Sequence, residues 1–354
     1  IQDLGNNTDW FRELTRTAVS HNNSLSVSGG TEKSNYRASV TYLNQPGVAL
    51  NSGFDRLNAR LNMNQKALND KLDIQFLVSA NTSKRNFIQY DAFRSALRIN
   101  PTLPVFNEDG TFFQPTGFEI ENPVARAAQL TDQRRDNQFL LNSKLFYEII
   151  DGLRVGVNGS FSIYTENGTR FTPSSYQGFG NRLSRGERYS REVQDRLVEA
   201  TLSYNKTFGQ HRLELLGGYT YQQLTNEGFG ADNRDFPDVF GANNIGVGEF
   251  NADGTFLGGV RSFRSEARLD GLLGRVGYYF ADKYLLTANF RRDGSSRFGA
   301  NNRYAFFPSI SLGWAISQEE FMKGVTFVSN LKLRAGYGVT GNQDGIADYA
   351  SRQL

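Results

Sequence analysis

Side chains that carry out catalysis are scarce in this chain. Its 354 residues include two histidines, His21 and His211, and no cysteine, which excludes thiol catalysis, disulfide frameworks and cysteine zinc sites. His211 follows a tight turn at the start of a strand, and His21 is placed similarly. No Ser–His pair and no carboxylate pair is placed for nucleophilic or acid–base work. We therefore predict no catalytic residues and no enzyme.

One group of carboxylates has the chemistry of a metal site. Asp232, Asp235 and Asp238 lie in a long connection, and Ca²⁺ takes such oxygen ligands. Their spacing is not that of an EF-hand loop, and Phe236 and Pro237 interrupt it. Glycine-rich pieces elsewhere lack the Lys-Ser/Thr pair of a phosphate-binding loop. The prediction is a solvated acidic loop, no metal and no cofactor.

Charged side chains recur on the polar phase of segments that alternate with apolar residues. Arg154, for example, stands between Leu153 and Val155, and Asn158 follows Val157. Strict alternation predicts a strand with one apolar and one polar face. The cations that share this placement and are our candidate site residues are Arg37, Lys144, Arg154, Arg275, Arg291 and Arg334. Because Arg or Lys on a lipid-facing side would cost about 2–4 kcal/mol at the bilayer midplane, we expect these residues to face a lumen.

The alternation predicts about twelve strands to hold these residues. Their approximate spans are 21–29, 34–44, 54–65, 71–82, 136–148, 153–165, 192–206, 211–223, 265–280, 284–293, 303–314 and 327–340. Most match the roughly 9–11 residues with which a tilted strand crosses a bilayer. The connections alternate short and long, with 315–326 as the exception, and outer-membrane barrels have short periplasmic turns and long outer loops. Aromatic residues at strand ends, such as Tyr42, Phe54, Tyr164 and Trp314, fit interfacial girdles, although cross-strand packing in a soluble sheet would also explain them.

Aromatic residues also occur in the predicted long connections. The candidates for contact with a ligand or partner are Phe112, Phe113, Tyr176, Phe229 and Phe236. Such rings can stack on sugars or bury against a partner, and the alternative is that the loops pack on themselves. The segment 293–299, DGSSRFG, is predicted to be a hairpin connection in which Arg297 pairs with Asp293 or contacts a plug.

Composition limits the class of protein further. The chain has 39 basic and 36 acidic residues, so a net charge of +3 gives no reason to expect nucleic acid as a partner. Its mean hydropathy is −0.50 and no long apolar run occurs, which excludes a transmembrane helix. Aromatic residues nevertheless make up 13% of the chain. A lipid face averaged with a polar lumen face gives this combination.

Three segments resemble one family. They are HNNSLSVSGGTEKSNYRASVTYLNQPG at 21–47, preceded by Thr8, Asp9 and Trp10, then KYLLTANFRRDGSSRFGANNRYAFFPSISLGW at 283–314 and LKLRAGYGVTGNQ at 331–343. The chain therefore resembles SusC/RagA-type TonB-dependent outer-membrane transporters. The resemblance implies an all-β, antiparallel up-and-down barrel of 22 strands, closed inside by a plug, in the outer membrane of a Gram-negative bacterium. It also implies a SusD-like lipoprotein partner, the TonB energy-coupling complex and import of a large nutrient, either an oligosaccharide (glycan) or a peptide.

On this interpretation the chain covers part of one barrel. Residues 1–20 lead from a plug that is absent here, 21–341 form about twelve strands of wall, and 342–354 start a surface loop. Because an open edge in lipid leaves backbone groups unpaired at several kcal/mol each, the first and last strands are predicted to be edges that pair with segments outside this chain.

The alternative is a soluble or surface β-rich binding protein, such as a sandwich adhesin without transport activity. The two hypotheses differ in the exposure of Val155, Val157, Phe161, Leu202 and Leu333. A barrel exposes these residues to lipid, whereas a sandwich buries them between two sheets.

Overall fold

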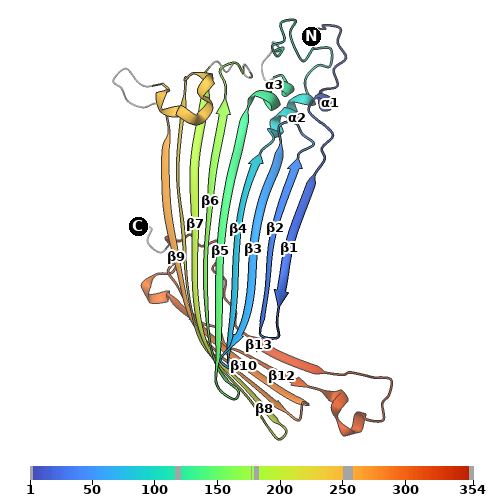
Figure 1. Ribbon diagram of the computed structural model, residues 1–354, viewed down its shortest axis with the longest axis vertical. Helices are drawn as coiled ribbons and strands as arrows, with labels where there is room; N and C mark the ends of the chain where they lie inside the picture. Colours follow the sequence, from blue (N-terminus) through green and yellow to red (C-terminus); the bar gives the residue numbers. More distant parts are fainter. Residues whose placement is uncertain (1–2, 116–120, 177, 179–182, 250–257, 351–354) are drawn as a thin grey trace.

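The computed structural model describes residues 3–115, 121–176, 178, 183–249 and 258–350 (Figure 1). These residues form one antiparallel sheet in which the strands follow chain order, except that the short β11 pairs with β10 beside β12. The strands are β1 (His21–Gly30), β2 (Ser34–Pro46), β3 (Gly53–Ala67), β4 (Leu72–Asn86), β5 (Thr131–Ile150), β6 (Leu153–Thr172), β7 (Arg185–Phe208), β8 (His211–Arg234), β9 (Val260–Phe280), β10 (Tyr284–Ser295), β11 (Tyr304–Phe306), β12 (Ser309–Trp314) and β13 (Leu333–Gly338). The predicted all-β, up-and-down architecture is confirmed.

The connections gather by length at the two ends of the sheet. At the end that we call the turn end, tight turns join β1 to β2, β3 to β4, β5 to β6, β7 to β8 and β9 to β10. Gly152 and Gly209 lie in two of these turns with φ of +81° and +57°, a conformation that glycine adopts without a steric penalty. The opposite end, the loop end, carries the long connections and helices α1 (Trp10–Glu13), α2 (Tyr90–Ala96) and α3 (Pro123–Gln129). The predicted alternation of short and long connections is thus confirmed.

Several strands are much longer than predicted. β7 and β8 have 24 residues each, which corresponds to about 80 Å at a rise of roughly 3.4 Å per residue. A hydrocarbon core is only about 30 Å thick, so these strands would continue well beyond it. The missed parts, such as 185–191 and 224–234, are polar at both phases or rich in glycine. Without a one-sided apolar pattern, the sequence offered no strand signal there.

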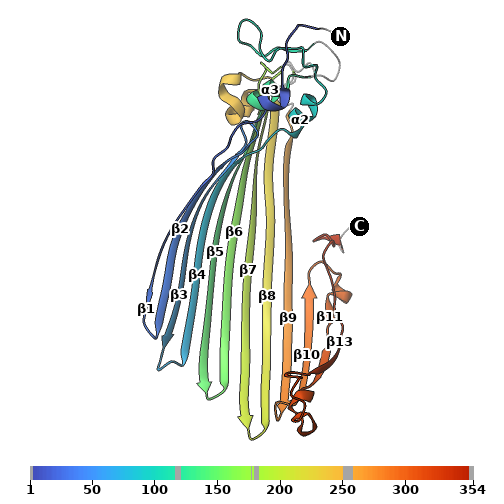
Figure 2. The ribbon, with the colours of Figure 1, turned by 90° about the vertical axis from the view of Figure 1, so that its right-hand side faces the viewer.

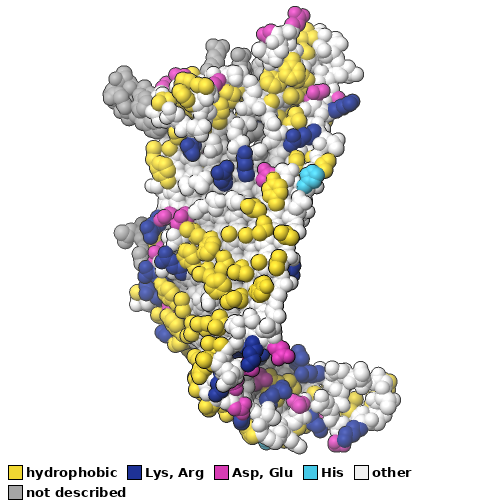
Figure 3. All heavy atoms as spheres, viewed as in Figure 1, with side chains coloured by type: hydrophobic (Ala, Val, Ile, Leu, Met, Phe, Trp, Pro, Cys, Tyr) yellow, Lys and Arg dark blue, Asp and Glu magenta, His cyan; other side chains and the backbone are white. Residues whose placement is uncertain are grey.

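The register gives the sheet two chemically different faces. Leu202 pairs with Val155 and Leu333 with Trp314, and this phase forms the apolar face. Leu202 is 50% and Leu333 60% exposed, and the hydrophobic side chains form a band over the middle of the strands in Figure 3. None of the five residues that distinguish the hypotheses is buried, because the described residues build one sheet and not two. The sandwich alternative is therefore wrong. No helix among the described residues is long and apolar enough to cross a membrane.

Aromatic residues border the apolar band at the turn end. The His211 ring lies 5.3 Å from the Phe208 ring and 4.9 Å from the Phe280 ring, and Phe280 stacks on Tyr284 at 6.2 Å. Nδ1 of His211 is 2.6 Å from the Tyr278 hydroxyl, so the histidine belongs to this aromatic row. Phe54 and Tyr164 were predicted to join the girdles, but the register places both on the polar face, and that part of the prediction is wrong.

A small core lies at the loop end. Trp10 and Leu14 pack with Ala92, Val124 and Ala127, which joins the N-terminal segment to the connection between β4 and β5. The segment around Trp10 is therefore seated among the loops: Trp10 Nε1 donates to the carbonyl of Asn100 at 3.2 Å.

The two ends of the sheet are open within the described residues. There β1 pairs with β2 alone and β13 with β12 alone, and the two strands lie on opposite sides of the curved sheet in Figure 2. The predicted edge positions are confirmed. The predicted strand 303–314 is divided into β11 and β12, since Pro308 between them has no N–H to donate.

Candidate functional site

The six candidate cations all lie on the polar face. Their cross-strand partners belong to that phase: Arg37 pairs with Asn62, Lys144 with Asn158, Arg154 with Ser203, Arg275 with Asn289, Arg291 with Leu273, and Arg334 with Gly313. The register thus brings together residues that are up to 297 positions apart (Arg37 to Arg334, 334 − 37) on one surface.

Two of the six are neutralised within the sheet. Nη2 of Arg154 is 2.7 Å from Oδ2 of Asp73, and its guanidinium lies 4.4 Å from the ring centroid of Phe146. Nε of Arg291 is 2.6 Å from Oδ1 of Asp293. Within the described part of the chain, Arg37, Lys144, Arg275 and Arg334 form no ion pair. Their charges remain available to a group that the sheet does not supply.

The polar face also has a pocket that the candidate list missed. Its volume is about 430 Å³, and it lies across β2 to β5. Its lining consists of Thr41, Arg56, Asn58, Arg60, Ser79, Asn81, Gln138 and Leu140. Arg56 and Arg60 occupy the polar phase of β3, so the alternation that selected Arg37 contained the signal for them too.

The loop aromatics divide into two groups. Tyr176 and Phe236 are each only 4% exposed, and the Phe236 ring lies 6.1 Å from that of Phe171. Phe112 and Phe113 are half-buried against the loop-end core. These four side chains pack within the loops, and contact with a ligand or partner stays a prediction for them. Phe229 is 56% exposed but lies inside β8, so its assignment to a loop is wrong.

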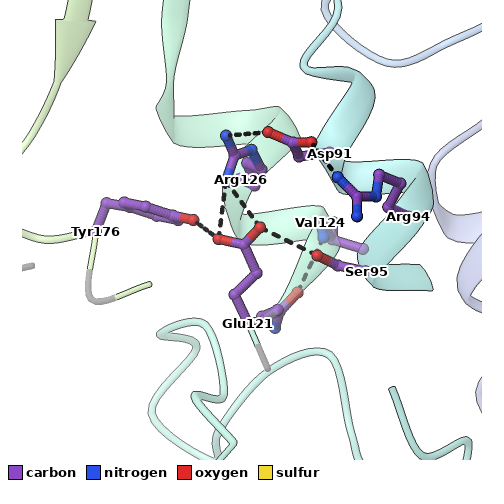
Figure 4. A network of polar contacts seen from close by, with 8 residues as sticks. Asp91, Arg94, Ser95, Glu121, Val124, Arg126 and Tyr176 are labelled. Atoms are coloured by element: carbon purple, nitrogen blue, oxygen red, sulfur yellow. Dashed lines mark hydrogen bonds and ion pairs between the residues drawn. The ribbon is translucent and has the colours of Figure 1, made fainter. Parts of the chain in front are cut away.

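A buried ionic network holds two loops together (Figure 4). The Glu121 side chain is fully buried and accepts from Nη1 of Arg126 at 2.8 Å, from the Ser95 hydroxyl at 3.1 Å and from the Tyr176 hydroxyl. Asp91 accepts from Nη2 of Arg126 at 3.2 Å. Burial raises the pKa of Tyr176, and although burial opposes it, Glu121 holds the pKa of Arg126 above its ordinary value. This network was not predictable from the residue pattern, because its members are brought together from two connections.

The DGSSRFG connection is joined to the segment after β13. Nε of Arg297 donates to Oδ1 of Asp348 at 3.0 Å, and Nη1 to the carbonyl of Gln343 at 3.3 Å. Asp293 is paired with Arg291, so the predicted Arg297–Asp293 pair is wrong. Residues 342–349 consequently fold back onto the loop end of β10, where Tyr349 also accepts from the backbone N–H of Glu266 at 3.1 Å.

A second polar cluster lies at the turn end. Glu319 accepts from Nε1 of Trp314 at 3.0 Å and from Nζ of Lys283 at 3.0 Å. Hydrogen bonds from Trp314, Tyr284 and Lys283 lower the pKa of Glu319 to about 2. The carboxylate thereby joins the connection between β12 and β13 to the aromatic row.

The three aspartates weighed as a metal site have separate roles. Asp232 lies in β8 near Arg261, at 3.6 Å. Asp238 accepts from the backbone N–H of Ser174 at 2.8 Å and from its hydroxyl at 2.8 Å. Asp235 takes a positive φ of 56° where the chain leaves β8. Among the described residues, no three potential ligands of this kind are grouped.

Known proteins share sequence similarity with almost the whole of this chain. The family model described as "TonB dependent receptor-like, beta-barrel" matches residues 72–352. The TonB-dependent receptor P3 of Formosa agariphila is 34% identical over 347 residues, which cover 95% of this chain and 34% of that protein. The TonB-dependent receptor SusC of Bacteroides thetaiotaomicron is 30% identical over 382 residues, covering 98% of this chain and 36% of SusC. The chain spans about a third of the length of these curated relatives.

A solved structure gives the same result for the fold. The RagAB peptide transporter superposes with a TM-score of 0.81 at 22% identity, covering 97% of this chain and 39% of that chain. The ferric citrate transporter FecA, without its ligand, reaches a TM-score of 0.52 at 11% identity, covering 86% of this chain and 41% of that chain.

Proposed function

This chain belongs to the TonB-dependent receptor β-barrel family, and from that premise we propose that it forms part of the wall of an outer-membrane importer. The observation that carries the proposal is the division of one sheet into a continuous apolar face and a charged face. A membrane wall needs the first face for lipid, and a polar conduit needs the second. In the whole protein, further strands would pair with the open edges of β1 and β13.

The cargo in this proposal is a large nutrient, either an oligosaccharide or a peptide. Similarity to SusC and to the RagAB peptide transporter supports this range, and the resemblance to the SusC/RagA type supports a SusD-like lipoprotein as partner. The surface for that partner would be the loop end, where Tyr90 and Val239 are 79% and 85% exposed. Energy would come from the TonB complex through a part of the protein outside this chain.

The test measures uptake in a Gram-negative host that carries the intact protein. Cells with and without its gene receive fluorescently labelled oligosaccharide and peptide pools, and the same cells are measured after TonB depletion. We expect uptake of at least one pool to fall to background in both cases. Binding that persists without TonB and without accumulation inside the cell would instead support a surface binding protein. Unchanged uptake after deletion would contradict the proposal.

A further inference from the structure

Four arginines on the polar face of β2 to β4 have no carboxylate partner. Arg37, Arg56, Arg60 and Arg85, which we call the arginine track, form no ion pair among the described residues. From β1 to β4 the polar face holds one carboxylate, Asp73, and that is paired with Arg154 across the sheet. This part of the face therefore carries a net positive charge that its own strands do not balance.

The neighbouring part of the same face is arranged differently. From β5 to β8 several cations are paired with carboxylates: Arg134 lies 3.4 Å from Glu166, and Arg170 lies 3.2 Å from Glu187 and 3.4 Å from Asp132. Lys144, Arg185 and Arg191 are the cations of this part that form no ion pair among the described residues. A wall whose charges had only a structural purpose would be expected to balance them locally in this way. The strands of the arginine track differ from β5 to β8 in having almost no carboxylates on this face, although single unpaired cations such as Lys144, Arg275 and Arg334 occur elsewhere on it.

Two phenyl rings contact the guanidinium groups of the track near the loop end of the sheet. The Arg85 guanidinium lies 5.1 Å from the ring centroid of Phe54 and 5.5 Å from that of Phe87. Arg56 approaches Phe54 at 6.0 Å, and Arg134 approaches Phe87 at 4.8 Å. Stacking on a ring holds a guanidinium in place while its N–H donors stay free for another group. The loop end and the middle of the sheet are thereby connected by a row of oriented cations.

The row leads into the pocket of about 430 Å³ on the polar face. Arg56 and Arg60 line the pocket together with amide and hydroxyl side chains, and no carboxylate lines it. Arg56 and Arg60 are four residues apart on one strand, which corresponds to roughly 13 Å. The pocket thus offers charged and polar donors for a negatively charged group.

We propose that the arginine track binds the anionic groups of the cargo, so that the preferred cargo is an oligomer with repeated carboxylates. This inference rests on the proposed importer function, because the polar face must line the conduit. Planar guanidinium groups form bidentate hydrogen bonds with carboxylates, which suits repeated anions spaced along a chain. Loss of two such contacts should weaken binding roughly tenfold to hundredfold.

The test uses the intact transporter, purified in detergent, and three defined probes. These are hexagalacturonate, hexaglutamate and neutral maltohexaose, with binding measured by calorimetry at low and high salt. We expect wild-type protein to bind at least one anionic probe, and binding to weaken with salt because the contacts are ionic. Arg56→Gln with Arg60→Gln should weaken anion binding roughly tenfold or more and leave the binding of maltohexaose, if any, unchanged.

Matched controls separate the track from general effects of charge and folding. Lys84→Gln with Arg135→Gln removes two exposed cations that face each other across β4 and β5 on the apolar-phase face, and it should leave binding unchanged. Arg56→Lys with Arg60→Lys keeps the charge and should retain part of the affinity, together with the salt dependence. Retained heat-modifiable mobility on gels shows that a variant is folded.

Two outcomes would overturn the inference while the importer function stands. One is TonB-dependent uptake in cells with no binding of either anionic probe. The other is anion binding that the Arg56/Arg60 double glutamine variant does not weaken, which would arise if acidic side chains elsewhere in the protein occupy the track. Absence of any TonB-dependent uptake would instead count against the proposed function itself.

Discussion

Glu121 illustrates how single residues stabilise the loop end. Its carboxylate is fully buried and receives donors from α2, α3 and the connection after β6, including the charged Arg126. A buried carboxylate is tolerated when hydrogen bonds and an opposite charge replace water. Removal of the charge leaves the guanidinium of Arg126, whose side chain is 15% exposed, without its main partner.

We predict that Glu121→Gln loosens α2 and α3 without disrupting the strands. Loss of a charged acceptor for buried donors costs roughly 1–3 kcal/mol. Hydrogen–deuterium exchange of the intact protein should therefore accelerate at 90–97 and 123–129, and remain unchanged in the middle of β7 and β8. Tyr176→Phe, which removes one neutral donor, should show a smaller increase at the same sites. Equal exchange in wild type and Glu121→Gln would mean that the network does not hold the loops.

Glu319 provides a pH-dependent contact at the turn end. Hydrogen bonds from Trp314, Tyr284 and Lys283 place its pKa at about 2, below the ordinary value of 4.5. Because the pKa is lowered in the folded state, the stabilising contact is complete above pH 4.5 and is lost as the pH falls toward 2.

The prediction is that Trp314 reports this titration. In protein labelled with 5-fluorotryptophan, the ¹⁹F resonance that disappears in Trp314→Phe should shift with a midpoint near pH 2, the pKa of Glu319. Glu319→Gln should abolish the shift, whereas Glu320→Gln, one residue away, should retain it. A midpoint near 4.5 in the wild type would show that the hydrogen bonds do not lower the pKa.

Strands were predictable from the sequence where one face is apolar. β6 was found from its start because Leu153, Val155 and Val157 alternate with polar residues, whereas 224–234 of β8 was missed because Gly228 and Gly230 interrupt the pattern. The same alternation placed the candidate cations on the polar face. The alternation does not indicate which cations are paired. The Arg154–Asp73 contact, for example, joins two residues that are 81 positions apart in the sequence.

The faces of β6 lead to a prediction about membrane insertion. Val157 lies on the apolar face and is 45% exposed, so Val157→Arg should cost about 2–4 kcal/mol if that face meets the bilayer midplane. The adjacent Asn158 lies on the polar face, where its Nδ2 donates to Glu199 at 2.7 Å. Asn158→Arg would keep a partner there and should have little effect.

Urea unfolding of the intact protein in lipid vesicles measures the difference. A lower midpoint for Val157→Arg with an unchanged midpoint for Asn158→Arg is the expected result. Similar midpoints for the two variants would mean that the apolar face of β6 does not contact lipid.

At the scale of the whole molecule, the open edges of the sheet determine how the wall is completed. β1 and β13 each pair on one side within the described residues, and an unpaired edge in lipid costs several kcal/mol for each free backbone group. Two arrangements would remove the cost: β1 and β13 could pair with each other, or each could pair with a further strand. The lateral order of the sheet, its curvature and the coverage of about a third of the relatives' length favour the second arrangement.

Engineered disulfides test this arrangement directly, and none of this chain's own residues competes for them, since it has no cysteine. Val27 of β1 faces Ala38 of β2. Directly opposed residues of antiparallel strands have Cα atoms about 4.5–5.5 Å apart, which is within the range of about 4.4–6.8 Å that a disulfide spans. Val27→Cys with Ala38→Cys should therefore crosslink in the intact protein. Val27→Cys combined with Cys at Leu333, Ala335 or Tyr337 of β13 should not crosslink in any of the three combinations, because further strands would separate the two edges. Mass spectrometry of membranes oxidised under mild conditions detects the linked peptides. A linked β1–β13 peptide would mean that these strands close a barrel by themselves, and the polar face would then enclose a much narrower lumen than a 22-stranded wall provides.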